Sequence, residues 1–328
     1  MINLKQSGKL GFGTAPLGNM FRDVPEQEAL DTVKAAWDNG IRYFDTAPFY
    51  GAGLAEMRLG EVLSKYNRDD YVLSTKIGRL ILDEKEEKEG LFEFGRKNKI
   101  VNDYTAEGTL RSIEHSLERL NTDRLDFVYV HDISPDFHGD EWLSKFEEAR
   151  TGAFRELNRL RDEGVIKGWG LGVNRTEPIE LANELEETKP DIHLQATRYT
   201  LLDHEHALQR LMPGSEEKEI KIVVGAPYGS GVIAGGSHYE YKKAPSKINS
   251  KVELMNEIAN RHQVSLISAA LQFSAAHPAV AAVIPGTTRP ERIQENISAM
   301  NAEIPVAFWQ EMKEQNLISA EAPLPIKE

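Results

Sequence analysis

The chain contains no cysteine, and this absence excludes several kinds of chemistry at once. Disulfides, thiolate metal ligands and a cysteine nucleophile are ruled out, and a reducing compartment, the cytoplasm, is the expected location. Basic residues are also outnumbered, with 39 Lys and Arg against 52 Asp and Glu, so the formal net charge is −13. Because that charge repels polyanions, no nucleic-acid partner is expected.

Long apolar runs are missing as well. No stretch approaches the roughly 18 consecutive apolar residues that a membrane span requires, and no membrane partner is expected. The first residues lack the apolar core of a secretory signal. With 40% hydrophobic and 28% charged residues in 328, the composition is that of a globular protein. No internal repeat or low-complexity linker divides the chain, so one domain over residues 1–328 is expected.

What the sequence does contain is an alternation of short apolar runs with helical periodicity, the pattern of repeated βα units. The expected strands are Leu10–Thr14, Ile41–Asp45, Tyr71–Lys76, Leu125–His131, Gly168–Val173, Ile192–Tyr199, Ile220–Val224 and Ala281–Pro285. Most are too continuously apolar for a sheet with one wet face, so helices must cover it. Eight such units close most simply into a (β/α)₈ TIM barrel, an α/β fold whose catalytic residues lie at the carboxyl ends of the strands.

Apolar residues that recur every three or four positions predict helices between these strands. The clearest are Glu26–Asn39, Glu107–Leu120 and Phe146–Asp162. Asn39-Gly40, Asn121 and Glu163-Gly164 provide the expected stops.

Three segments are additional to the eight βα units that a minimal barrel needs. The stretch from Gly78 to Tyr104 is long and charged but contains aromatics, which favours a substrate wall over a free loop. The stretch from Pro213 to Ile248 carries many glycines after the seventh strand. Beyond Ile304, apolar spacing predicts one extra C-terminal helix packed on the barrel.

Four reactive side chains follow three of the expected strands. Asp45 and Tyr50 follow the second, Lys76 ends the third and His131 ends the fourth. A tyrosine has an unperturbed pKa of about 10, and the ammonium of Lys76 is expected to lower it. Asp45 would hold Lys76, and His131 would polarise a substrate oxygen. This set suits proton transfer to or from a carbonyl or alcohol oxygen, and a redox reaction would also need a nicotinamide cofactor.

Other interpretations of these motifs are weaker. The glycines of Gly11–Gly18 superficially match a dinucleotide fingerprint, but the third glycine is misplaced and Pro16 blocks the helix. His131-Asp132, with Asp45 and His138, would suit a metallohydrolase, yet no ligand shell is completed and no metal is expected. A Schiff-base role for the strand-end lysine is the remaining alternative.

The segment Phe44–Gly51, with the lysine and histidine that follow it, resembles the signature of the aldo-keto reductases, and the resemblance covers nearly the whole chain. It implies a catalytic tetrad of Asp45, Tyr50, Lys76 and His131. It also implies a nicotinamide cofactor whose carboxamide binds Asn174 and Gln195. The residues implied to contact the pyrophosphate and adenosine are Pro227, Gly229, Gly231, Gly286, Thr287, Arg289, Arg292, Glu295 and Asn296.

Further motifs are similar to one subgroup, the D-threo-aldose (L-fucose) 1-dehydrogenases and pyridoxal 4-dehydrogenases. They are Gly51–Gly60, Asn102–Gly108 with Arg111-Ser112, and His131-Asp132. The resemblance implies an NAD(P)-dependent oxidoreductase, foremost an aldose 1-dehydrogenase acting on the anomeric hydroxyl of a sugar. Pyridoxal oxidation and general aldehyde reduction are alternatives with the same site, and a cofactor-binding regulatory subunit is an alternative of another class.

Two departures from common members of the family affect the cofactor. The sequence Val224–Pro227 lacks the aromatic residue that stacks on the nicotinamide, so this contact must be absent or come from elsewhere. Gly286 stands where members that prefer NADPH have a lysine. We therefore expect NAD to be used at least as well as NADP, with Arg289 and Arg292 providing the remaining NADP affinity.

Overall fold

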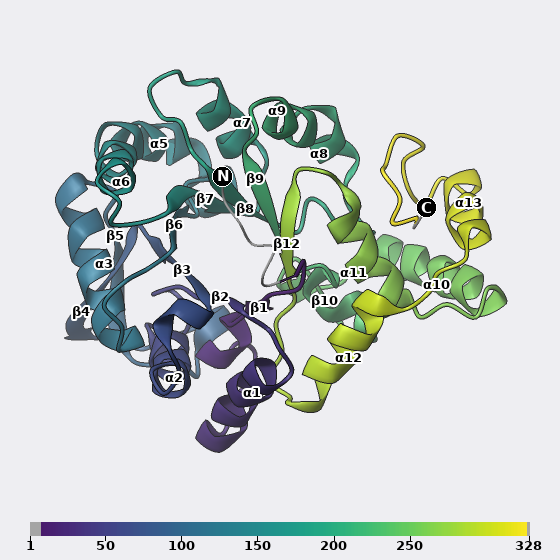
Figure 1. Cartoon of the computed structure of the whole chain (residues 1–328), viewed down its shortest axis with the longest axis horizontal. Coiled ribbons are helices and arrows are strands. Elements are labelled where there is room, and N and C mark those ends of the chain that lie inside the picture. The colour runs from purple at the N-terminus through teal and green to yellow at the C-terminus, as the bar shows by residue number, and fades with distance from the viewer. Residues whose placement is uncertain (1–7, 327–328) are drawn as a thin grey trace.

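Parallel strands close into a barrel in the computed structural model, which describes residues 8–326 (Figure 1). In sheet order, the eight strands are β1 (Phe12–Gly13), β2 (Tyr43–Asp45), β3 (Val72–Ile77), β6 (Phe127–His131), β7 (Gly168–Val173), β8 (Ile192–Ala196), β9 (Lys221–Gly225) and β12 (Val280–Ile284). Isolated parallel bridges close the seam between first and last, pairing Leu10 with Val283 and Gly13 with Gly286. The predicted (β/α)₈ fold is confirmed.

Helices surround the barrel, and most of them bury an apolar stripe (Figure 1). The α-helices are α1 (Glu26–Asp38), α2 (Leu54–Leu63), α3 (Ala106–Leu120), α4 (Pro135–His138), α5 (Trp142–Thr151), α6 (Ala153–Asp162), α7 (Glu177–Glu184), α8 (Glu205–Gln209), α9 (Leu211–Glu217), α10 (Ser246–Arg261), α11 (Leu266–Ala276), α12 (Glu291–Asn301) and α13 (Val306–Glu314). In α1, the stripe of Ala29, Val33 and Ala36 is buried as its spacing predicts. No helix within residues 8–326 has the length and apolar character needed to cross a bilayer.

The helix expected over Phe146–Asp162 is wrong, because the structure has two helices there, α5 and α6, that meet at Gly152. Gly152 has φ −108° and ψ −88°, which is not helical. A Cβ at this position would lie 2.7 Å from the carbonyl oxygen of Tyr104. The chain therefore bends where it passes another backbone, and periodicity alone does not reveal such a contact.

The long insert after β3 is folded as an antiparallel hairpin of β4 (Arg79–Lys85) and β5 (Asn98–Asn102). After β9, the 3-10 helix η6 (Gly229–Ala234) leads to a small hairpin of β10 (His238–Tyr239) and β11 (Lys242–Lys243). Near the C-terminus, α13 buries Phe308, Trp309 and Met312 in a cluster shared with α10 and α11, so the extra helix lies where the sequence predicts it.

The barrel interior is apolar except for a chain of hydroxyl groups that leads toward its rim. Tyr43, on β2, places its hydroxyl 3.0 Å from that of Tyr129 and 3.0 Å from Ser74 Oγ. Ser74 in turn donates to Asp45 Oδ1 at 2.8 Å. Each of these three hydroxyls thus has a partner, and the series ends on a carboxylate at the carboxyl end of β2.

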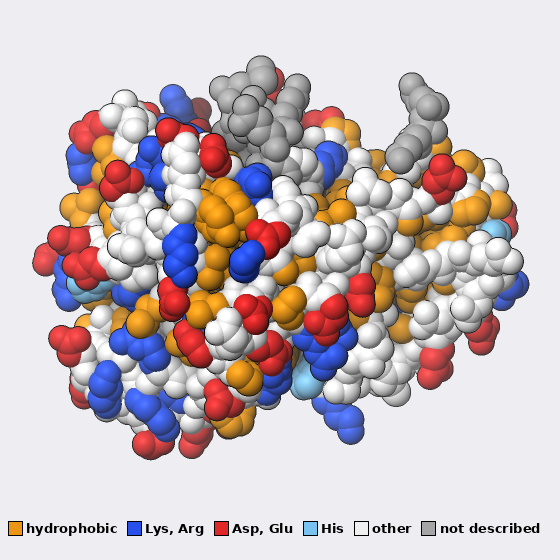
Figure 2. Space-filling model, turned by 60° about the horizontal axis from the view of Figure 1, so that its bottom comes forward, with side chains coloured by type: hydrophobic (Ala, Val, Ile, Leu, Met, Phe, Trp, Pro, Cys, Tyr) orange, Lys and Arg blue, Asp and Glu red, His pale blue; other side chains and the backbone are white. Residues whose placement is uncertain are grey.

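Charged side chains of both signs are scattered over one face of the molecule (Figure 2). On the face drawn in Figure 2, Lys and Arg side chains are interspersed with Asp and Glu side chains. This mixture is consistent with the acidic net charge of −13 and leaves no broad basic surface on that face.

Candidate active site

The predicted catalytic residues converge on one rim of the barrel. Asp45, Lys76 and His131 lie at or near the carboxyl ends of β2, β3 and β6, which are consecutive parallel strands in the sheet. Tyr50 lies in the turn that follows β2. Because parallel strands end at the same edge, side chains distant in sequence come together here.

Lys76 and Asp45 form a buried ion pair. Lys76 Nζ lies 2.6 Å from Asp45 Oδ2 and also donates to the carbonyl oxygen of Thr46 at 2.8 Å. The two residues are only 1% and 2% exposed. Lys76 is thereby fixed by charge-assisted hydrogen bonds and cannot swing out to solvent without leaving a buried carboxylate unpaired.

Two glycines hold the turn that carries Tyr50. Gly51 has φ +65°, and a Cβ on it would lie 2.3 Å from the carbonyl oxygen of Gly18. A Cβ on Gly18 would lie 2.5 Å from the carbonyl carbon of Tyr50. The loop after β1 and the turn after β2 therefore pack backbone against backbone, which only glycine at both positions allows.

Tyr50 faces both a cation and an imidazole. Its ring centroid is 4.7 Å from Lys76 Nζ and 5.9 Å from the ring centroid of His131, to which it is nearly perpendicular. Burial raises the pKa of the Tyr50 phenol well above its usual value, and the carboxylates of Asp45 and Asp132 raise it further. The lowered pKa expected from Lys76 is therefore wrong, since burial, together with the two carboxylates, outweighs the charge of that lysine.

His131 is a neutral imidazole. Burial lowers its pKa well below the usual value, and the nearby cations Lys76 and Arg79 lower it further. Its Nδ1 is buried without a hydrogen-bond partner among residues 8–326, while Nε2 lies 3.4 Å from Asp132 Oδ2. A neutral imidazole carries one N–H donor, which suits the polarisation of a substrate oxygen.

The sequence did not single out Arg79, which adds a second buried ion pair beside these residues. Arg79 begins β4 in the insert, and its Nη2 donates to Asp132 Oδ2 at 2.7 Å. The guanidinium carbon lies 4.1 Å from the ring centroid of Phe49 and 4.7 Å from that of Phe137. Burial raises the pKa of Asp132 to about 6, against the lowering effect of Arg79. The only signal in the sequence was the Asp that follows His131.

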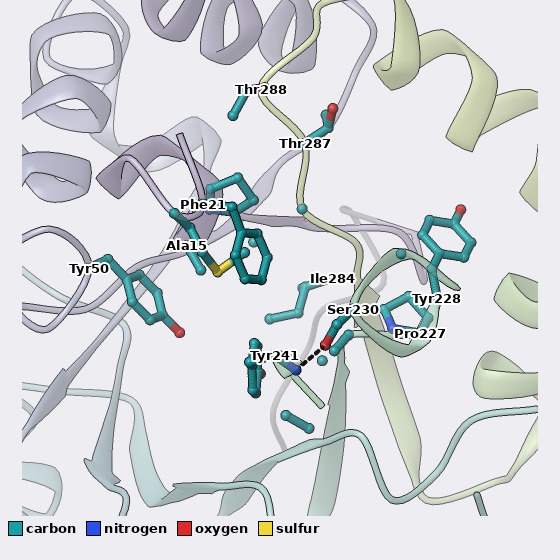
Figure 3. A pocket seen from close by; sticks show the side chains of 18 of the residues that line it. Ala15, Phe21, Tyr50, Pro227, Tyr228, Ser230, Tyr241, Ile284, Thr287 and Thr288 are labelled. Atoms are coloured by element: carbon teal, nitrogen blue, oxygen red, sulfur yellow. Dashed lines mark hydrogen bonds between the residues drawn. The ribbon is translucent and has the colours of Figure 1, made fainter. Parts of the chain in front are cut away.

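Two cavities meet at Tyr50. The smaller one, about 70 Å³, is lined by Lys76, His131 and Asp132 and has aromatic walls. The larger one, about 450 Å³, extends toward β12 and the loop that follows it. Figure 3 shows that the Tyr50 hydroxyl points toward the middle of the larger cavity and the Tyr228 hydroxyl points away from it. Tyr241, from the β10–β11 hairpin, lines both cavities and was missed by the sequence analysis.

The residues implied to hold a cofactor divide into three groups. Those that line the larger cavity are Pro227, Gly231, Gly286, Thr287, Arg289 and Arg292. Asn174 lines the smaller cavity. Gly229, Gln195, Glu295 and Asn296 line neither, and Asn296 instead accepts a hydrogen bond from the Tyr228 hydroxyl at 2.7 Å.

Gln195 lines neither cavity, but it is a buried residue of β8 whose side-chain oxygen has no partner among the described residues. Its Nε2 donates to the carbonyl oxygens of Asn174 and Ala196 at 2.8 and 2.9 Å. Its Oε1 is buried and has no hydrogen-bond partner in the part of the chain that the structure describes. An orphaned buried acceptor of this kind fits an amide donor of a bound ligand.

The far end of the larger cavity is basic. Arg289 and Arg292 line it, and so does Arg22, which the sequence analysis missed. Arg22 donates to Thr288 Oγ1 at 2.6 Å and pairs with Glu28. Backbone that is not shielded by a side chain, at Gly231 and Gly286, and basic side chains at one end suit a ligand with phosphates. A dinucleotide is an elongated ligand of this kind.

His138 and Asp132, which the sequence offered as alternative metal ligands, also lie close to this rim. Tyr104 donates its hydroxyl to the carbonyl oxygen of His131 at 2.8 Å and lies 3.0 Å from His138 Nε2. Within residues 8–326, no three His, Asp or Glu side chains are grouped as ligands for a metal ion.

Comparison with known proteins agrees with this geometry. The sequence profile described as the Aldo/keto reductase family matches residues 9–316. The chain is 36% identical over 326 residues to a pyridoxal 4-dehydrogenase of Microbacterium luteolum, with 94% of each chain covered. It is 35% identical over 320 residues to a D-threo-aldose 1-dehydrogenase of a Pseudomonas species, again with 94% of each covered.

A solved structure gives the same result. The holo form of an aldo-keto reductase from Bacillus halodurans superposes with a TM-score of 0.72 at 25% identity, covering 96% of this chain and 93% of that one. Profile, relatives and superposition each span nearly the whole chain, including the strands that carry Asp45, Lys76 and His131. The chain therefore belongs to the aldo/keto reductase family and is an oxidoreductase that uses a nicotinamide cofactor.

Proposed function

We propose that this enzyme, working as a single domain, is an aldose 1-dehydrogenase that oxidises the anomeric hydroxyl of a sugar to a lactone. The observation that carries the proposal is the convergence of Tyr50, His131 and the Lys76–Asp45 pair, 2.6 Å apart, at the junction of the two cavities. The 35% identity to a D-threo-aldose 1-dehydrogenase supports the sugar as substrate.

In the proposed reaction, the substrate hydroxyl gives its proton to the Tyr50 phenolate. His131 donates its N–H to the same oxygen, and the Lys76 ammonium, 4.7 Å from the centre of the Tyr50 ring, stabilises the phenolate. A bound nicotinamide ring would accept the hydride from the anomeric carbon, whose C–H bond breaks as the carbonyl of the lactone forms. Because burial raises the pKa of Tyr50, oxidation should be favoured by alkaline solution, whereas the protonated phenol is ready to act as an acid in reduction.

If a dinucleotide binds in the larger cavity, residues outside the tetrad would contact it. Gln195 Oε1 and Asn174 would hold the carboxamide, since one is an orphaned acceptor and the other lines the smaller cavity. The loop at Pro227 and Gly231 would contact the pyrophosphate. Tyr241 is an aromatic side chain at the junction of both cavities and is our candidate for the ring contact that Val224–Pro227 cannot provide.

A second candidate function, the oxidation of pyridoxal, rests on the relative that is 36% identical over 94% of the chain. A spectrophotometric screen separates the two. NAD and NADP are each tested with a panel of aldoses, pyridoxal and simple aldehydes, and reduced cofactor is measured at 340 nm. Efficient turnover of aldoses supports the proposal. Turnover of pyridoxal alone replaces it with the second candidate.

The basic end of the larger cavity gives a prediction on cofactor preference. Gly286 offers no ammonium there, so we expect NAD to be used at least as well as NADP. Arg289 is exposed and has no ion pair among the described residues, so Arg289→Ala should weaken NADP by about ten- to a hundredfold, the value of one charged hydrogen bond, and NAD much less.

Cofactor titrations of wild type and variant test this prediction. The matched control is Arg261→Ala, which removes an exposed arginine that pairs with Glu311, away from the cavity. A wild-type preference for NADP of about a hundredfold or more would contradict the prediction and show that other groups, Arg22 among them, bind the phosphate.

A further inference from the structure

We propose that Asp132, held in place by Arg79, recognises the hydroxyl group on the carbon next to the reacting carbon. The inference rests on the proposed function and identifies the side chain that would make this site prefer hydroxylated substrates over simple aldehydes. It assigns a specificity role to an ion pair that takes no part in the proton transfer proposed above. Three independent observations support it.

The first observation is an unused acceptor at the cavity. Asp132 lines the smaller cavity together with Tyr50 and His131, although it is only 4% exposed. Its Oδ2 is bound to Arg79 Nη2 at 2.7 Å, whereas no hydrogen bond from the described residues reaches its Oδ1. A carboxylate can only accept hydrogen bonds, so Oδ1 is free to accept one from a ligand in the cavity. A substrate hydroxyl is a donor that would satisfy it.

The second observation is that the position of Asp132 is imposed by its surroundings. Its φ is +55°, in the left-handed region that residues other than glycine rarely adopt. The backbone is held there by its N–H, which donates to the carbonyl oxygen of Gly172 at 3.0 Å. Unusual backbone of this kind persists where the surrounding structure fixes it, and it clusters at functional sites.

Arg79 fixes the other end of the pair. Its guanidinium contacts the rings of both Phe49 and Phe137, and the residue is only 9% exposed. Its Nε is buried and has no hydrogen-bond partner in residues 8–326. The two rings therefore hold the guanidinium in place, and its charge-assisted hydrogen bond is directed at Asp132.

The third observation is the spacing of the two groups that would contact the substrate. His131 Nε2, expected at the reacting oxygen, lies 3.4 Å from Asp132 Oδ2. This contact places the carboxylate, whose Oδ1 is the free acceptor, directly beside the imidazole, so oxygens on neighbouring carbons of one substrate can reach both side chains. Phe49, Phe92 and Phe137 give the cavity apolar walls against which the C–H face of a sugar ring can pack.

The test compares two substrates on each enzyme. We would measure kcat/KM for an aldose and for its 2-deoxy analogue with wild type, Asp132→Asn and Asp132→Ala. The wild type should prefer the aldose by about ten- to a hundredfold, and both variants should lose most of that preference. Because both rates come from one preparation, partial misfolding and any change in the pKa of Tyr50 cancel in the ratio.

A control variant is available just before the same strand. Asp126 precedes β6 at its opposite end and is a buried carboxylate, paired with Arg68 at 2.6 Å. Asp126→Asn should lower stability but keep the wild-type substrate ratio. The inference is overturned if the wild type shows no preference, or if Asp132→Asn and Asp132→Ala keep it.

A second substrate pair separates this inference from the proposed function. Reduction of 2-hydroxypropanal is compared with reduction of propanal, which lacks only the hydroxyl. If aldoses are oxidised but neither ratio depends on Asp132, the inference alone fails. If aldoses are not oxidised, yet the preference for 2-hydroxypropanal disappears in Asp132→Asn, the proposed function fails and the inference stands.

Discussion

Replacing Tyr50 by phenylalanine should lower turnover by about 10²–10⁴, the usual contribution of a general acid or base. The change removes one hydroxyl and keeps the ring, which is positioned by backbone contact between Gly18 and Gly51 and not by that hydroxyl. We therefore expect an intact fold and a nearly unchanged cofactor dissociation constant. Steady-state turnover, circular dichroism and quenching of protein fluorescence by the cofactor measure the three quantities.

Tyr66→Phe is the matched control for this experiment. It also removes a phenolic hydroxyl, but from a ring that stacks on Trp37 at 3.9 Å outside both cavities. Its turnover should stay close to that of the wild type. Near-normal turnover in Tyr50→Phe would refute the assignment of Tyr50 as the acid or base.

Lys76→Met should damage stability and catalysis together. It leaves Asp45 buried without its cation, and breaking a buried ion pair costs about 3–5 kcal/mol of unfolding free energy. It should also raise the pKa of Tyr50 further, because an ammonium 4.7 Å from the ring is lost and the charge of Asp45 is no longer offset. The rate of oxidation should then rise only at higher pH than in the wild type.

The sign of the stability effect can be checked separately. An unpaired buried Asp45 has a raised pKa, so its carboxylate destabilises the folded state at neutral pH, and this penalty fades as the pH falls and the group is protonated. Denaturant unfolding at several pH values measures it. The double variant Asp45→Asn, Lys76→Met should recover most of the stability but not the activity. If it remains as unstable as Lys76→Met, the loss comes from packing and not from charge.

The sequence was sufficient to predict the barrel and the positions of the four catalytic candidates. Strand ends are marked by polar residues after apolar runs, and parallel strands bring those ends together, so Asp45, Lys76 and His131 could be placed without a structure. These predictions depend only on local pattern and on the geometry of one sheet.

The remaining features depend on contacts between distant segments, which leave no periodic signal. Arg79 reaches Asp132 across 53 residues, and Arg22 reaches Thr288 across 266. The break at Gly152 follows from a passing backbone carbonyl and not from its own helix. The direction of the pKa shift at Tyr50 was missed for the same reason, since burial is a property of the whole fold.

The seam between β12 and β1 is not a continuous ladder, and we expect it to open more readily than the middle of the sheet. Strand β1 has only two residues, Phe12 and Gly13, and the seam is held by isolated bridges. Its two edges, Gly13 and Gly286, both line the larger cavity, so a bound dinucleotide would touch both sides of the gap.

We therefore expect the seam to open and the cofactor to leave in one motion. In hydrogen exchange, the amide of Gly11, bonded to the Val283 carbonyl at 2.9 Å, should exchange faster than the amide of Leu171 in the middle of the sheet. Saturation with NAD should slow exchange at Gly11 far more than at Leu171, because ligand that binds only the closed form suppresses the opening. Equal slowing at both amides would show instead that the barrel opens as a whole.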